Sequence, residues 1–138
     1  MRKRYVYGYK FIKPQKAEET GWNYVIQAHR NQNGLHFDFR LAKPGNSYAY
    51  SWASNKMPLA TGSPILARRT SDHDVAHLDF QGNLDTAKGT GYVKILKRGN
   101  ATVRSISDDG IKFQLDSGED ITLRNVSGKK YMIERSYN

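Results

Sequence analysis

The chain has 138 residues and a formal net charge of +9, from 22 Lys and Arg against 13 Asp and Glu. This length predicts one domain that buries roughly two-thirds of the surface its unfolded chain exposes. Cysteine is absent, which excludes disulfides and thiolate metal sites, and no apolar run approaches the roughly 18 residues of a membrane span. We therefore expect a soluble, intracellular (cytoplasmic) monomer whose positive charge favours nucleic acid over a membrane as its partner.

Residues 1–20 are expected to form a basic aromatic arm that precedes a single domain over residues 21–138. The first 16 residues contain no acid, and tyrosines and a phenylalanine alternate with the cations. Cationic and stacking side chains together bind nucleic-acid strands, although a solvated, frayed terminus would have the same composition. We assign nucleic-acid contacts to the six cations of the arm: Arg2, Lys3, Arg4, Lys10, Lys13 and Lys16.

Residues 22–29 and 35–41 predict two strands joined as an antiparallel hairpin. Between them lies Arg30-Asn31-Gln32-Asn33-Gly34, and its Asn and Gly residues favour a tight reversal. Pairing of these strands would bring His29, at the end of the first, near His36, at the start of the second.

The second strand, Leu35-His36-Phe37-Asp38-Phe39-Arg40-Leu41, alternates apolar and chemically active residues without interruption. Successive side chains of a strand point to opposite faces, so one face packs and the other presents His36, Asp38 and Arg40. Imidazole and carboxylate donors suit a divalent metal, and a guanidinium suits phosphate. We expect His29, His36 and Asp38 to form a metal site beside Arg40; a water-facing amphipathic strand is the alternative.

The rest of the chain predicts a mainly all-β fold. Turn residues recur about every ten residues, one predicted turn being Arg98-Gly99-Asn100, and a short helical turn is expected within residues 74–80. This rhythm is typical of a sandwich or a compact small β-barrel of short antiparallel strands with minor helical turns. The predicted strands are residues 47–53, 65–70, 91–96, 101–106, 111–115, 121–126 and 131–133.

The two remaining histidines, His73 and His77, are four positions apart, which would place them on one side of a helical turn. Each alone is compatible with a surface or a satisfied core position. Beside a phosphate-sized site they become candidate phosphate donors or general acids, because histidine titrates near neutral pH.

These pieces resemble the 3'-phosphoesterase domain of DNA ligase D, the bacterial and archaeal end-joining repair enzyme, here as a free-standing unit. The most specific match is the combination of His29, a loop and the run from Leu35 to Leu41. The matching segments follow the family's order from about residue 22 to the end of the chain: 24–29, 35–41, 51–53 (Ser51-Trp52-Ala53), 72–73 (Asp72-His73), 80–82, 89–91 and 128–135.

The resemblance implies a compact β-barrel, nuclease-like hydrolase that depends on Mn²⁺, with other divalent transition metals as substitutes. Such enzymes remove a 3'-terminal ribonucleoside and then the remaining 3'-phosphate from DNA or DNA/RNA primer-template ends, which leaves a hydroxyl for non-homologous end joining. By position, His29, His36 and Asp38 would hold the metal, and Arg40 and His73 would bind phosphate, with His73 as proton donor. A separate ligase, polymerase or Ku-type protein is the expected protein partner.

The chain departs from the family pattern at several positions. The loop from His29 to His36 has one extra residue, which the hairpin must absorb at Asn33-Gly34. His77 stands where the family commonly has tyrosine, and we assign it to catalysis and phosphate binding. Ile65 replaces a phosphate-binding arginine, for which Arg68 or Arg69 could compensate. The other departures are Ser71 for glutamate and Asp74 for proline.

Two other classes of function are compatible with the sequence. His36-Phe37-Asp38 with a distal His73 also matches the His-x-Asp…His triad of non-haem iron oxygenases, but those barrels usually need a longer chain, and no convincing cosubstrate-binding arginine follows His73. A catalytically weak module that binds or guards nucleic-acid ends is the second alternative, and tight end binding without a metal-dependent product would identify it.

Overall fold

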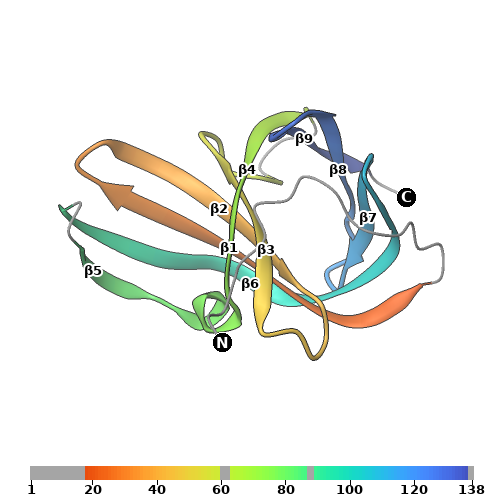
Figure 1. Cartoon of the computed structure of the whole chain (residues 1–138), viewed down its shortest axis with the longest axis horizontal. Helices are drawn as coiled ribbons and strands as arrows, with labels where there is room; N and C mark the ends of the chain where they lie inside the picture. Colours follow the sequence, from red (N-terminus) through yellow and green to blue (C-terminus); the bar gives the residue numbers. More distant parts are fainter. Residues whose placement is uncertain (1–17, 60–62, 87–88, 137–138) are drawn as a thin grey trace, which may run out of the picture.

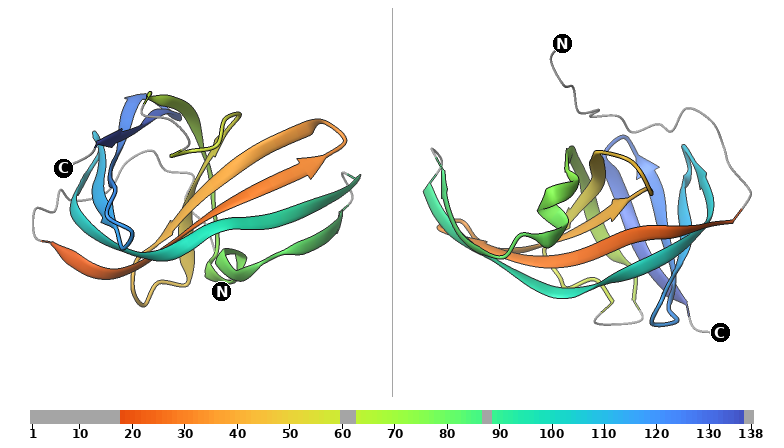
Figure 2. Two further views of the ribbon diagram at one scale, coloured as in Figure 1. Left: turned by 180° about the vertical axis from the view of Figure 1, so that it is seen from behind. Right: turned by 90° about the horizontal axis from the view of Figure 1, so that it is seen from below.

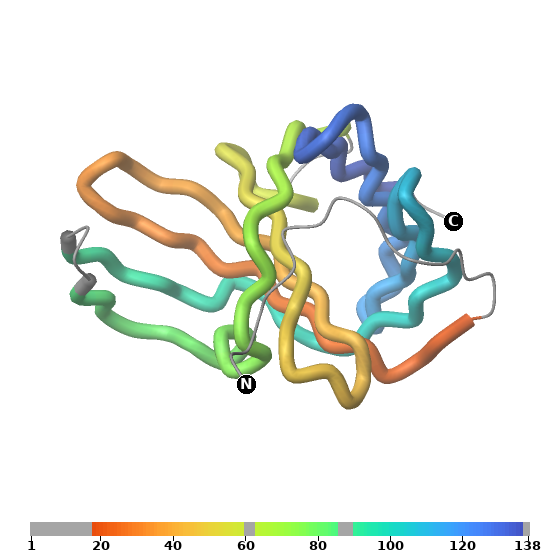
Figure 3. The backbone as a smooth tube through the Cα atoms, in the orientation of Figure 1, coloured from red at the N-terminus to blue at the C-terminus, as the bar shows by residue number. Residues whose placement is uncertain are grey.

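The computed structural model describes residues 18–59, 63–86 and 89–136, which form nine strands and one short 3₁₀ helix. The sheet order is β1-β2-β3-β4-β9-β8-β7-β6-β5, every pairing is antiparallel, and a further β1–β6 pairing closes an eight-stranded barrel with β5 as an extra strand (Figures 1 and 3). The predicted all-β barrel is confirmed. The elements are β1 (Glu19–Asn31), β2 (Gly34–Ala42), β3 (Tyr48–Ser54), β4 (Ile65–Asp74), η1 (Val75–Asp79), β5 (Gly82–Thr86), β6 (Gly89–Ser107), β7 (Gly110–Leu115), β8 (Asp120–Ser127) and β9 (Lys130–Ser136).

The barrel carries an extension on one side. The β1–β2 hairpin and the β5–β6 hairpin both project beyond the closed ring of strands, and η1 lies near the place where this extension leaves the ring (Figure 2). Because β1 pairs with both β2 and β6, the extension is a continuous part of the same sheet. The strands that carry the predicted metal ligands therefore pass from the barrel wall into this extension.

The core of the barrel explains why the strands alternate in sequence. Inward-facing residues of neighbouring strands fill a small barrel, and burying their apolar surface is the main favourable contribution to folding. The largest fully buried side chains are Trp22, Trp52, Tyr24, Tyr131, Phe39 and Phe113.

Among the described residues, no helix is long and apolar enough to cross a lipid bilayer.

The β1–β2 hairpin forms as predicted, with Asn31 paired to Gly34 across Gln32 and Asn33. Gly34 has φ +118°, which a residue with a Cβ rarely adopts, and the Asn33 backbone N–H donates to Asn31 Oδ1 at 2.8 Å. The two-residue turn accommodates the extra loop residue without a bulge between His29 and His36. The register therefore places the two histidines directly opposite each other.

The predicted turn at Arg98-Gly99-Asn100 is wrong, because β6 runs without interruption from Gly89 to Ser107 and joins two strands that were expected to be separate. Gly99 pairs with Tyr24 in β1, and a Cβ on Gly99 would lie 2.5 Å from Asp116 Oδ2. The same carboxylate accepts a hydrogen bond from the Asn100 backbone N–H at 3.0 Å. The glycine thus makes room for an aspartate and does not reverse the chain. The structure also contains β5, which was not predicted from the sequence, and η1 confirms the predicted helical turn.

Candidate metal and phosphate site

The predicted metal ligands converge at the β1–β2 hairpin. His29 and His36 are Cα partners, and their ring centroids lie 4.7 Å apart. Asp38, two residues beyond His36 on the same face of β2, places Oδ2 3.3 Å from His36 Nε2. One donor atom from each of the three residues lies within 4.8 Å of the other two. Three side chains from one rigid hairpin thus point nitrogen and oxygen donors at a common volume.

The charge states of these side chains suit a cation. Burial raises the pKa of the Asp38 carboxyl, but the hydrogen bond with His36 and the charge of Arg40 outweigh it, so the pKa lies below its ordinary value. Burial and then the charge of His36 lower the pKa of His29, which is therefore neutral near pH 7. The hydrogen bond to Asp38 raises the pKa of His36. A carboxylate and a neutral imidazole are metal ligands as they stand, and His36 becomes one by losing a proton.

Arg40 lies on the same face of β2, with only 8% of its surface exposed. Its Nε donates to Gln27 Oε1 at 2.7 Å and its Nη1 to Ser51 Oγ at 2.8 Å, while Nη2 lies 3.5 Å from Asp38 Oδ2. A guanidinium has five N–H donors, so these contacts hold the group in place and leave donors for an anion. Arg40 is therefore pre-oriented beside the three candidate ligands.

Gln27 connects this arginine to η1. It is 1% exposed, and its Nε2 donates to the backbone oxygens of His77 at 2.7 Å and of Phe80 at 3.0 Å. The amide thus links the Arg40 guanidinium to the helix that carries His77. Sequence reasoning missed both Gln27 and Ser51. Gln27 could have been found, because it precedes His29 by two residues and so shares its face, whereas Ser51 is brought to Arg40 only by the β2–β3 register.

His73 lies in β4 and His77 in η1, and their rings are neighbours. Their ring centroids lie 5.1 Å apart at an interplanar angle of 73°. Burial, then the charges of Arg40 and His77, lower the pKa of His73 to about 4. Burial and Arg40 also lower the pKa of His77, while the Asp38 charge opposes the shift at both rings. Both histidines are therefore neutral near pH 7 and lie within electrostatic reach of Arg40 and Asp38.

The two candidate compensating arginines lie on opposite faces of β4. Arg69 is 2% exposed, with its guanidinium 5.0 Å from the centroid of the Tyr50 ring and 3.4 Å from Asp72 Oδ1. Arg68 is exposed and lines a pocket together with His36. Of the two, Arg68 is thus the one that borders the site.

The other departures from the family pattern lie at the edge of this site or outside it. Ile65 is 5% exposed and packs in the barrel core. Ser71 is half-buried in β4, and Asp74 ends that strand and directly precedes η1. The arm cations, Arg2, Lys3, Arg4, Lys10, Lys13 and Lys16, lie outside the described residues.

Comparison with known proteins gives one family. The family model described as the DNA ligase D 3'-phosphoesterase domain matches residues 27–129, a span that begins at Gln27 and contains every candidate metal and phosphate residue discussed above. A search of curated proteins found no match. Because the family model covers well over half of the 138 residues and the site geometry lies within the matched span, the chain belongs to the DNA ligase D 3'-phosphoesterase domain family.

Proposed function

We propose that this protein is a metal-dependent DNA 3'-end-processing phosphoesterase that removes 3'-terminal ribonucleosides and 3'-phosphates. Membership of the family makes it a phosphoesterase of DNA-repair end processing. The observation that carries the finer proposal is the convergence of His29, His36 and Asp38 on one volume with Arg40 directly beside it. A metal cation and an adjacent, fixed guanidinium can bind different oxygens of the same phosphoryl group and stabilise its negative charge.

Mn²⁺ is the proposed cofactor, held by His29, His36 and Asp38. Two imidazole nitrogens and one carboxylate oxygen form a borderline-to-hard donor set, which suits Mn²⁺ and related divalent metals and does not favour thiolate-seeking ions. When bound, such an ion supplies Lewis-acid polarisation of a phosphoryl oxygen and lowers the pKa of water. The family relationship favours this hydrolytic chemistry over the oxygenase alternative.

The chain's own residues bind the phosphate and supply a proton. Arg40 donates to phosphate oxygens with the N–H groups that Gln27 and Ser51 do not use. In each reaction a water oxygen adds to phosphorus and releases a proton to solvent, while the bond to the leaving oxygen breaks and that oxygen takes a proton. His73 is the proposed donor of this proton. Burial and then the charge of Arg40 lower the pKa of His73, so a bound phosphate that offsets the Arg40 charge would raise this pKa again.

The test uses two primer-templates, one ending in a single 3'-ribonucleotide and one in a 3'-phosphate, incubated with and without Mn²⁺ and separated on a denaturing gel. We expect shortening of the first, dephosphorylation of the second, and neither product in Asp38→Asn. The matched control is Asp109→Asn, which changes an exposed aspartate in the β6–β7 turn. Calorimetric titration with Mn²⁺ alone should show binding to the wild type and to Asp109→Asn, and none to Asp38→Asn.

Loss of both products in Asp109→Asn, or retention of both in Asp38→Asn, would contradict the assigned metal site. Tight binding of the ends with no metal-dependent product would instead identify the end-binding module, which the net charge of +9 also favours. Under the proposed function the product hydroxyl is a substrate for a separate polymerase or ligase.

A further inference from the structure

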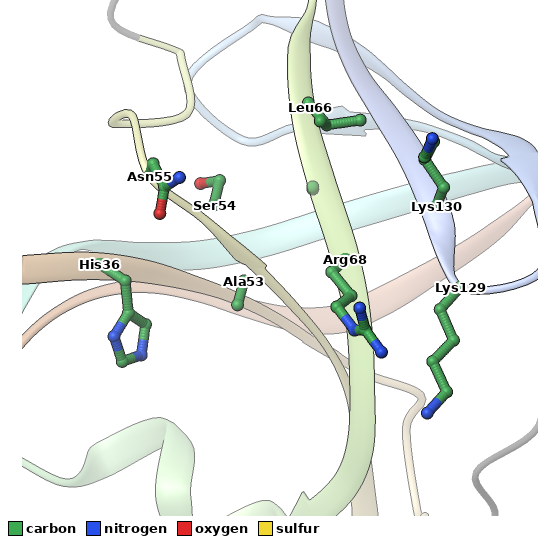
Figure 4. A pocket seen from close by; sticks show the side chains of 9 residues that line it. His36, Ala53, Ser54, Asn55, Leu66, Arg68, Lys129 and Lys130 are labelled. Atoms are coloured by element: carbon green, nitrogen blue, oxygen red, sulfur yellow. The ribbon is translucent and has the colours of Figure 1, made fainter. Parts of the chain in front are cut away.

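The pocket that Arg68 and His36 line has a volume of about 380 Å³ and adjoins the candidate metal site. It lies between the end of β3, the start of β4 and the turn that joins β8 to β9 (Figure 4). His36 is the residue common to the metal ligands and to this pocket. A ligand in the pocket is therefore next to whatever occupies the metal site.

The charge of the pocket is strongly one-sided. Arg68, Lys129 and Lys130 line it, and among the residues that the structure describes no acidic one does. Arg68 and Lys130 are Cα partners across β4 and β9, and the Arg69 N–H donates to the Lys129 carbonyl at 2.8 Å, so the sheet holds all three cationic residues together. Like charges directly opposite each other on adjacent strands destabilise a sheet. A bound anion would turn this unfavourable cluster into a favourable one.

The pocket also offers a non-ionic surface. Leu66, 57% exposed, lies on the same side of β4 as Arg68, and the Asn55 amide lies at the end of β3 (Figure 4). An exposed leucine beside cations suits a ligand that has an apolar part and an anionic part, as a nucleotide unit has in its sugar and its phosphate.

The proposed reaction indicates which part of the substrate would occupy this pocket. The leaving group of the first step is a nucleoside, and it carries no phosphate. The retained strand carries a phosphodiester at each nucleotide, and the same strand is retained when the 3'-phosphate is removed. We propose that Arg68, Lys129 and Lys130 bind the phosphodiester immediately 5' of the reacting phosphate. This inference rests on the proposed function and adds to it a subsite for the retained strand, shared by both reactions.

The first experiment compares an oligonucleotide that ends in a 3'-phosphate with bis(p-nitrophenyl) phosphate, a diester that has no neighbouring phosphate. In the Arg68→Ala/Lys130→Ala double variant we expect kcat/KM to fall on the order of tenfold more for the oligonucleotide than for the small diester, mainly through KM. Lys112→Ala, which removes an exposed cation from β7, is the matched control and should show no such difference.

The second experiment locates the phosphate. A methylphosphonate, which is neutral, replaces the linkage immediately 5' of the reacting phosphate. The substitution should weaken turnover by the wild type and have little further effect on the double variant, since the two changes remove one interaction. Equal losses in both proteins, or no loss in the wild type, would overturn the proposal.

Binding without Mn²⁺ separates this proposal from the proposed function. Fluorescence anisotropy with a single-stranded oligonucleotide measures the salt dependence, and the slope of log K against log salt should flatten by about 0.7 in the double variant, the contribution of the one single-strand phosphate that the protein no longer neutralises. If the wild type turns over neither substrate but this slope changes, the proposed function fails and the subsite stands. If turnover is present and the slope is unchanged, the subsite fails alone.

Discussion

Replacing Arg40 by lysine keeps the charge and removes the geometry, so it tests whether the guanidinium acts through its fixed fork of donors. Arg40 is 8% exposed and donates at 2.7 Å to Gln27 and at 2.8 Å to Ser51, two residues that are themselves 1% and 0% exposed. A lysine ammonium is a single point and cannot reproduce both directions together with a phosphate contact. At least one buried polar atom then loses its partner, which costs about 1–3 kcal/mol.

We therefore expect Arg40→Lys to lower the free energy of unfolding by about 2 kcal/mol and to lower kcat on the order of 100-fold, the effect of removing one donor to a reacting phosphoryl or acyl oxygen. Urea titrations followed by tryptophan fluorescence measure the first quantity, since Trp22 and Trp52 are fully buried. Steady-state turnover of a 3'-phosphorylated oligonucleotide measures the second.

The control is Arg124→Lys. Arg124 is an exposed arginine on β8 whose Nε donates to Glu134 at 2.7 Å, and exposed ion pairs contribute at most about 1 kcal/mol. This variant should resemble the wild type in stability and turnover. Wild-type stability and turnover in Arg40→Lys would refute the bidentate role of the guanidinium.

Ser51→Ala, which removes one of the two hydrogen-bond partners of Arg40, should show a smaller loss of stability than Arg40→Lys.

Three further outcomes are expected. Removing residues 2–16, which lie outside the described residues, should flatten the salt dependence of DNA affinity by about 0.7–0.9 for each phosphate that the arm neutralises and leave the saturated single-turnover rate unchanged; an unaltered slope would contradict a binding role for the arm. The pKa of His73 is about 4 in the folded protein and near 6.5 in an unfolded chain, so the unfolded state binds the proton first. Stability should fall as pH drops from 6.5 to 4, on the order of 2 kcal/mol after allowance for solvent screening, and by less in His73→Gln; parallel urea-midpoint profiles would count against this. Because burial and Arg40 lower the pKa of His77, this ring becomes a cation only below pH 6.5. A cation binds the more highly charged terminal phosphate more strongly than a diester, so the rate of 3'-phosphate removal relative to ribonucleoside removal should rise only below that pH in paired time courses, and His77→Tyr should abolish that rise.

The sequence could predict the hairpin and its ligands because each signal was local. The alternation of residues 35–41 depends only on the period of a strand, and the two-residue turn places His29 opposite His36 once both strands exist. The sequence could also predict which side of β4 faces the core. Buried Ile65 and Ala67 alternate with exposed Leu66 and Arg68, and the same period carries Arg69 inward.

Contacts between residues distant in the chain could not be read in the same way. Gly99 resembles a turn residue until the Asp116 carboxylate is seen against it, because a glycine that makes room for a neighbour and a glycine that reverses the chain give the same local pattern. Ser51 reaches Arg40 through the β2–β3 register, and Gln27 acquires its role from the carbonyl oxygens of η1. Each of these contacts is set by barrel closure and packing.

The protonation states of the site bear on turnover as well as on binding. His29, His73 and His77 are neutral near pH 7 because burial and neighbouring charges lower their pKa values. The permanent charges of the site are then those of the ligand Asp38 and of Arg40, with His36 neutral once it serves as a ligand. Permanent cations at His73 and His77 would bind substrate and released phosphate alike, and such uniform binding does not accelerate the reaction. Under the proposed function, His73 gains its proton only when a bound phosphate offsets the Arg40 charge, so the free site carries no such permanent cation, while the cations proposed to hold the retained strand, Arg68, Lys129 and Lys130, lie in the adjoining pocket. The separation lets the retained strand stay bound between the two reactions while the products, a nucleoside and then phosphate, leave.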